Sequence, residues 1–287
     1  MRFLNVGHNA ETVARFAHAV NGRHVADAAE LGPAYRRALA GLRPYAPPGS
    51  GVDISHEDGK WADHCRSSGI LEDVFAAPRA TDGPTRKMYE AHVHEAFAHV
   101  RSLDPNLHRI IELLVTDIVL LDSGVGGGSV NTLPGVIVMS PGEAWDVPRY
   151  AECLVHEAMH TALFVTDTVY GLFSLTSREL EDERYHALSA VKVGEMRPLD
   201  RAFHAAGVAL PLMYLQHLRG VTPLDSYTES FREVCRSLGR VREHFSDYGR
   251  LLLDEMTRWA DAEPLDFDHL AHAISSMEYA NYRPVAA

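Results

Sequence analysis

The chain has 287 residues, of which 46% are hydrophobic and 23% charged, a balance typical of a globular protein with one large domain or two ordinary ones. Its formal charge of -12, from 39 acidic and 27 basic residues, argues against a nucleic-acid binder or a membrane-surface binder, because either needs a concentrated basic face. Three widely spaced cysteines, Cys65, Cys153 and Cys235, predict neither a disulfide framework nor a metal knuckle, and no long apolar run predicts a membrane span, so we expect a cytoplasmic protein.

Helical periodicity dominates the first half of the chain. Apolar residues recur every three or four positions from Asn9 to about Arg43, from about Met88 to Val100, and from Leu107 to about Leu121. The stretch RPYAPPGSG interrupts this pattern after the first helices and is a candidate linker. We therefore predict a helical N-terminal lobe at residues 1–85, separate or part of one domain, and the main domain at residues 86–287.

The pattern changes in DSGVGGGSVNTLPGVIVMSPGEAW. Here several glycines surround a β-branched run at Val136, Ile137 and Val138, which predicts a short strand with flexible approaches. Asp146 and Pro148 then predict the start of a helix, with Asp146 as its N-cap. The expected fold class is predominantly helical α+β, with this helix beside a small sheet or edge strand.

The predicted helix contains LVHEAMHTALF, which has the HExxH spacing of metal-binding helices. His156 and His160 are four residues apart, so both imidazoles project from one face and can bind one ion. Glu157 points about 100° away around the helix, where it can receive a proton from metal-bound water or position a substrate. The neighbours of these residues are apolar, which predicts a buried helix.

A catalytic metal usually has three protein ligands and an open position, so a third ligand is needed. Glu179 follows His160 by nineteen residues, close to the spacing of thermolysin-like zinc peptidases, although its stretch SRELEDER also fits the start of a solvated helix. His204 opens an apolar stretch that runs to Leu215, and it fits either a ligand or a core histidine. The residues alone leave both candidates open.

Three stretches together resemble a known family, the HExxH-type 2-oxoglutarate-dependent peptide β-hydroxylases of bacterial natural-product clusters. They are LPGVIVMSP, ECLVHEAMHTAL and MRPLDRAFHAAGVA, which lie between Leu133 and Leu215. Their order is a HExxH helix, an Arg-Pro-Leu step, and a histidine that enters an apolar helix. Members of the family are described as non-haem iron enzymes that hydroxylate ribosomally made peptides.

The resemblance implies a ligand set and a co-substrate. His156 and His160 would bind Fe(II), and His204 would be the third ligand. Arg197 would pair with a carboxylate of 2-oxoglutarate, since a guanidinium can hold a carboxylate through two hydrogen bonds. The expected enzyme is a dioxygenase, an oxidoreductase that hydroxylates a peptide, a carrier-bound amino acid or a free amino acid in natural-product biosynthesis.

Two other functions fit the same motif. In a zinc-dependent metallopeptidase, His156, His160 and Glu179 would hold Zn²⁺ while Glu157 receives the proton of the attacking water, and the strand near Val136 would pair with an extended peptide. In a non-catalytic helical protein the metal would be structural.

Overall fold

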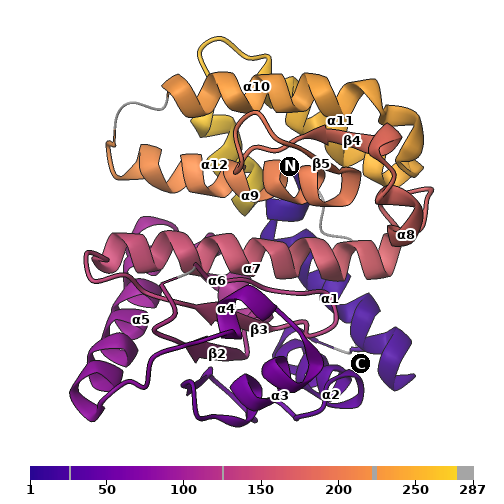
Figure 1. Ribbon diagram of the computed structural model, residues 1–287. Helices are drawn as coiled ribbons and strands as arrows, with labels where there is room; N and C mark the ends of the chain where they lie inside the picture. Colours follow the sequence, from indigo (N-terminus) through magenta and orange to yellow (C-terminus); the bar gives the residue numbers. More distant parts are fainter. Residues whose placement is uncertain (26, 125, 222–224, 277–287) are drawn as a thin grey trace. The chain divides into compact units, whose positions relative to one another are not determined.

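The computed structural model describes residues 1–25, 27–124, 126–221 and 225–276, with the backbone alone for 225–229. Of these, residues 13–161 form one compact unit, here named the sheet unit, and residues 1–12 with 162–276 form a second, the helical unit. Helices α1 (Val6–Asn21) and α7 (Val147–Tyr170) each continue from one unit into the other. The fold is predominantly helical α+β, as the sequence predicts (Figure 1).

The sheet unit also contains α2 (Ala28–Leu42), β1 (Asp53–Ser55), α3 (Lys60–Ser68), α4 (Glu72–Phe75), α5 (Gly83–Leu103), α6 (Pro105–Leu114), β2 (Asp117–Leu120) and β3 (Val136–Met139). The helical unit contains η1 (Arg2–Leu4), α8 (Ser177–Leu180), η2 (Glu183–Tyr185), β4 (His186–Leu188), β5 (Met196–Pro198), α9 (Leu199–Leu218), α10 (Asp225–Arg240), η3 (Arg242–His244), α11 (Asp247–Ala260) and α12 (Phe267–Ser275).

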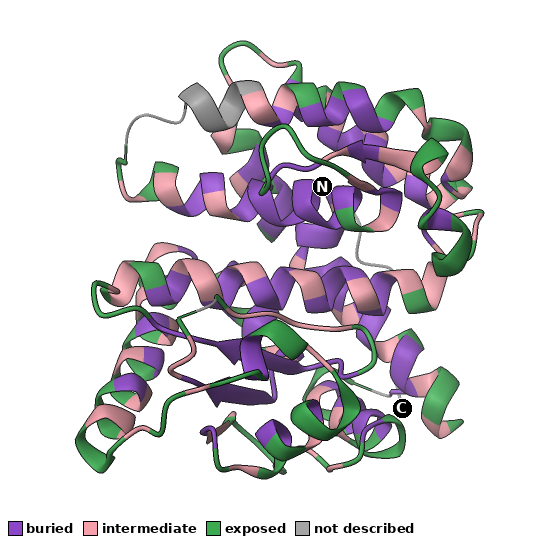
Figure 2. Cartoon of the chain, in the orientation of Figure 1, coloured by how far each residue is buried: buried purple, intermediate pink, exposed green. Residues whose placement is uncertain are grey.

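The three strands of the sheet unit form a parallel sheet in the order β1-β2-β3. Every residue of β2 and β3 is buried, as expected for parallel strands that are covered on both faces (Figure 2). One face, which includes Val119, Val136 and Val138, packs against Trp61 of α3 and Phe75 of α4. Strand β3 confirms the strand predicted at Val136–Val138.

One predicted helix was wrong at its end. The helix expected from Leu107 to about Leu121 ends at Leu114, and Asp117–Leu120 form the central strand β2. The run from Val115 to Val119 is rich in β-branched residues, which pack well on a pleated surface, and Val115 already has extended dihedrals. Pairing with β1 and β3 gives these backbone groups their hydrogen bonds.

The predicted boundary near residue 85 does not coincide with a boundary of either unit. Strand β1 comes from the segment predicted as an N-terminal lobe, and it pairs with β2 from the following segment, Ser55 opposite Val119. Strands that share backbone hydrogen bonds belong to one sheet and therefore to one domain. Residues 13–85 are part of the sheet unit.

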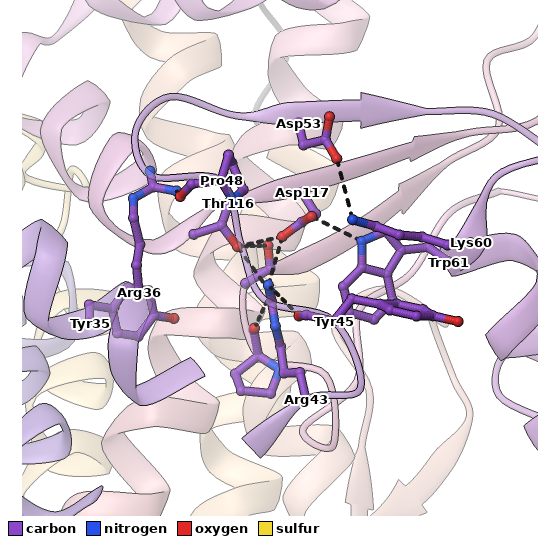
Figure 3. A network of polar contacts seen from close by, with 12 residues as sticks. Tyr35, Arg36, Arg43, Tyr45, Pro48, Asp53, Lys60, Trp61, Thr116 and Asp117 are labelled. Carbon is purple, nitrogen blue, oxygen red and sulfur yellow. Dashed lines mark hydrogen bonds and ion pairs between the residues drawn. The ribbon is translucent and has the colours of Figure 1, made fainter. Parts of the chain in front are cut away.

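A buried polar network ties the start of the sheet to α2 and α3 (Figure 3). Arg43 and Asp117 form an ion pair of 2.9 Å in which the side chains are 0% and 1% exposed. Trp61 Nε1 and the Thr116 hydroxyl also donate to the Asp117 carboxylate, over 2.9 and 2.8 Å. Arg43 donates further to the Pro134 carbonyl just before β3. The network thus joins β2 and the segment before β3 to α3 and the end of α2.

Helix α9 forms the core of the helical unit, because every residue from Ala202 to Pro211 is buried. A helix that is apolar on all sides is a core helix. Strands β4 and β5 pair antiparallel, with Ala187 opposite Arg197. At Gly249, on α11, a Cβ atom would lie 2.0 Å from the Leu172 carbonyl oxygen, so only glycine fits there. Across the described helices, length and apolar character fall short of what a membrane crossing requires.

Candidate metal-binding site

Helix α7 carries the HExxH motif, and its start is where the sequence predicts it. The Arg149 N–H donates to Asp146 Oδ1 over 3.0 Å, which confirms Asp146 as the N-cap. Pro148 lies in the first turn, where a missing N–H leaves no intrahelical bond unmade. Arg149 also pairs with Glu152 over 3.1 Å.

His156 and His160 lie on one face of α7, with ring centroids 4.9 Å apart. Their separation of four residues is about one helical turn, so two imidazoles can approach one ion from the same side. Leu154, Val155, Ala158 and Met159 are buried around them, which confirms the buried helix, while the two histidines keep some exposure. The pair is therefore accessible to an ion although the helix is part of the core.

Burial favours the neutral form of His156. Burial, and to a smaller extent the positive charge of Arg149, lower the pKa of His156 to about 4. At neutral pH this imidazole carries no proton on one ring nitrogen, which is the form that binds a metal.

Glu157 is 5% exposed and points away from water. Its Oε1 lies 3.9 Å from His156 Nε2. Burial raises the pKa of Glu157 to about 7, and a hydrogen bond from Ser129 opposes that rise. A carboxyl group with this pKa exchanges protons readily at neutral pH, as a general base beside a metal must.

Ser129 is the residue near the motif that sequence reasoning missed. Its hydroxyl donates to Glu157 Oε2 over 2.8 Å. It follows the glycine run that the sequence predicts as a flexible approach to the strand, but Gly128 instead exchanges two backbone hydrogen bonds of 2.9 Å with Val138 of β3. The signal was the density of glycines, which permits close backbone approach.

Cys153 precedes Glu157 by four residues on the same helix. Burial, and then the charge of Glu157, raise the pKa of the Cys153 thiol. This cysteine therefore stays protonated, and a protonated thiol is a poor metal ligand.

The two other predicted residues lie in the helical unit. His204 is 6% exposed on α9, and burial lowers its pKa to about 4. Its ring centroid lies 4.8 Å from that of Phe164. Arg197 is half-buried on β5, two residues before α9 begins, and its side chain has no hydrogen-bonded or ion-paired partner among the described residues.

Glu179 serves as a helix cap. Its Oε2 accepts hydrogen bonds from the Thr176 N–H and hydroxyl, over 2.8 and 2.7 Å, while the Thr176 hydroxyl accepts from the Glu179 N–H. This reciprocal pair is a capping box at the start of α8, on an exposed part of the helical unit. The arrangement matches the solvated helix start that the sequence also allowed.

Within the described ranges, no three His, Cys, Asp or Glu side chains gather closely enough to hold a metal. His156 and His160 of the sheet unit thus form a pair that needs a further ligand. The set of His156, His160 and His204 stays a prediction. No protein-family model and no curated protein matches the chain.

Proposed function

We propose that the protein is a non-haem Fe(II)- and 2-oxoglutarate-dependent hydroxylase that acts in the cytoplasm on a peptide or amino-acid-derived substrate in natural-product biosynthesis. The observation that carries the proposal is the histidine pair, His156 and His160, with rings 4.9 Å apart beside a buried carboxyl group. Imidazole suits iron as a ligand, and two imidazoles one turn apart form one side of a coordination sphere.

The third ligand in this proposal is His204. Its ring packs against Phe164 within the helical unit. Burial lowers the pKa of its imidazole to about 4, so at neutral pH it has the neutral form that binds a metal. In the proposed site the three histidines would together hold the Fe(II) ion.

Arg197 is the proposed anchor for 2-oxoglutarate. It precedes His204 by seven residues, and the β5–α9 connection holds both in one unit. A guanidinium without a partner among the described residues can pair with a carboxylate through two hydrogen bonds. Lys192 is less suited, because it is exposed and pairs with Glu195 over 3.4 Å.

Glu157 would balance charge at the metal. Three neutral imidazoles leave the full positive charge of Fe(II), and a carboxylate adjacent to His156 offsets it without becoming a ligand. When bound, iron and 2-oxoglutarate supply the activation of dioxygen that inserts a hydroxyl group into a C–H bond.

Two observations count against the zinc-peptidase alternative. The Glu179 carboxylate is engaged in the α8 capping box, so recruiting it to a metal would break that cap. The outer edge of β3, on which a peptide would pair, carries the bridge between Gly128 and Val138. A structural metal in a non-catalytic protein leaves the unpartnered Arg197 unexplained.

An anaerobic titration tests the proposal. Fe(II) and 2-oxoglutarate together should give a visible metal-to-ligand charge-transfer band in the wild type, no band in His156→Ala, and in Arg197→Leu a band only at higher 2-oxoglutarate concentration. Lys192→Leu, a matched loss of one positive charge, should titrate like the wild type. Absence of the band from a protein that purifies with zinc would refute the hydroxylase.

The third ligand has its own test. His204→Ala should weaken metal binding by 10-fold or more, at the scale of about 10–100-fold measured for supporting groups in metal sites. Glu179→Ala should leave metal affinity unchanged and lower only stability, by about 0.5–2 kcal/mol, the cost of a lost cap. The opposite pattern would move the assignment to the peptidase.

A further inference from the structure

The glycine run before β3 holds a defined position in the sheet unit. Gly128 and Val138 exchange N–H to carbonyl bonds in both directions, each 2.9 Å, so the segment lies antiparallel to the outer edge of β3. We name residues 127–129 the glycine strap. Such pairing fixes the strap in register with a strand that is itself buried.

Glycine is required at position 127 of the strap, whereas at position 128 a side chain would meet only the end of the Leu71 side chain. A Cβ atom at Gly127 would lie 2.0 Å from the Val138 carbonyl oxygen, which is backbone and cannot move aside. At Gly128 a Cβ atom would lie 2.9 Å from a Leu71 methyl group. By contrast, Gly126 has open space around the same position. The close approach of the backbone thus places the next residue, Ser129, at a set distance from α7.

The strap brings Ser129 to Glu157. The serine hydroxyl donates to Oε2 over 2.8 Å. Among the described residues, no other group donates a hydrogen bond to this carboxylate. The other oxygen, Oε1, faces His156 Nε2 at 3.9 Å. A hydrogen bond to one oxygen of a buried carboxylate restricts its rotation, so the serine influences where the second oxygen lies relative to His156.

We propose that Ser129 is a positioning residue, which orients the Glu157 carboxylate toward the histidine pair, and that the glycine strap exists to hold Ser129 there. The contact between the two side chains stands by itself, whereas its effect on a bound metal rests on the proposed function. In metal sites, substitution of the groups that hydrogen-bond to the ligands typically changes metal affinity by about 10–100-fold.

A double-mutant cycle on metal-free protein tests the contact. Ser129→Ala should lower the melting temperature by about 2–4 °C and shift the Glu157 carboxyl carbon signal in a ¹³C spectrum, while Ser129→Thr, which keeps the hydroxyl, should restore both. In a Glu157→Met background, where the acceptor is gone, Ser129→Ala should cost much less. The control is Ser140→Ala, which removes a hydroxyl bonded to Ser123 and should act equally in both backgrounds.

Metal affinity tests the positioning role. Ser129→Ala should weaken Zn²⁺ and Co²⁺ binding by about 10-fold, with no such effect in the Glu157→Met background. Two results would overturn the proposal. In the first, the effects of Ser129→Ala and Glu157→Met on the melting temperature are additive and the Glu157 carboxyl signal does not move. In the second, the two residues are coupled but Ser129→Ala leaves metal affinity unchanged. A wild type that binds neither metal would refute the proposed function, and coupling in the metal-free protein would still establish Ser129 as the residue that orients Glu157.

Discussion

Asp117→Asn tests whether the buried network of Figure 3 anchors the sheet unit. The carboxylate receives three donors: Arg43 Nη2 and Trp61 Nε1 over 2.9 Å each, and the Thr116 hydroxyl over 2.8 Å. Asparagine has the same shape but offers one oxygen and two N–H donors, so at least one bond becomes a donor facing a donor. The substitution also leaves the Arg43 charge without its partner.

The expected cost follows from burial. Both side chains of the pair are at most 1% exposed, so water cannot replace the lost partner. Removing one member of a buried ion pair costs about 3–5 kcal/mol, because the other charge stays desolvated. Arg43→Met added to Asp117→Asn removes that charge, and the double variant should recover part of the loss.

Urea unfolding followed by tryptophan fluorescence measures these changes, since Trp61 belongs to the network. The matched control is Asp63→Asn, which breaks an exposed ion pair with Arg66 in the same unit. The side chains of Asp63 and Arg66 are 67% and 42% exposed. It should change the free energy of unfolding by less than about 1 kcal/mol. A cost below about 1 kcal/mol for Asp117→Asn would refute the argument that the pair anchors the sheet.

Three further predictions concern other parts of the fold and use the same unfolding assay. Gly127→Ala should lower the free energy of unfolding by about 1–3 kcal/mol, because its Cβ meets a β3 carbonyl. The control Gly126→Ala should stay within about 0.5 kcal/mol of wild type, and equal effects of the two substitutions would contradict the position of the strap. Gly249→Ala should cost a similar amount, about 1–3 kcal/mol, against the Leu172 carbonyl. Burial lowers the pKa of His8 from 6.5 to about 4. The neutral side chain therefore contributes its full stability above pH 6.5, and that stability is lost as the pH falls toward 4, because the unfolded chain binds the proton first. Between about pH 7.5 and about pH 5, the free energy of unfolding of the wild type should therefore fall by about 2 kcal/mol more than that of His8→Gln. Parallel plots of unfolding free energy against pH for the two proteins would show that His8 is not responsible.

Local signals in the sequence predicted the long helices and the motif helix. Asp146 caps α7 as its residue type and position suggest, because a cap depends on neighbours within one turn. The helical spacing of His156 and His160 fixes their common face for the same reason. These features follow from periods of a few residues and need no knowledge of the rest of the chain.

The features that the sequence did not predict depend on pairing between distant segments. Strand β2 has an apolar run that fits a buried strand and a buried helix equally, and its neighbours β1 and β3 decide the outcome. Strands β1 and β5 have three residues each, too few for an alternating pattern. The contact of Ser129 with Glu157 joins residues 28 apart and depends on the glycine strap.

The same distinction explains why the HExxH motif alone does not determine which reaction the site would catalyse. One helix can present two ligands to an ion, but a third ligand on that helix would have to come from the same narrow face, so it must come from another segment. Glu179 already has a structural task, since its carboxylate caps α8, and recruiting it would cost that cap. His204 lies past the first turn of α9 and caps no helix, so ligation by it would leave every helix cap intact. Under the proposed function, the α8 cap is therefore a reason to choose His204 rather than Glu179 as the third ligand, and the ligand substitutions described above test that choice.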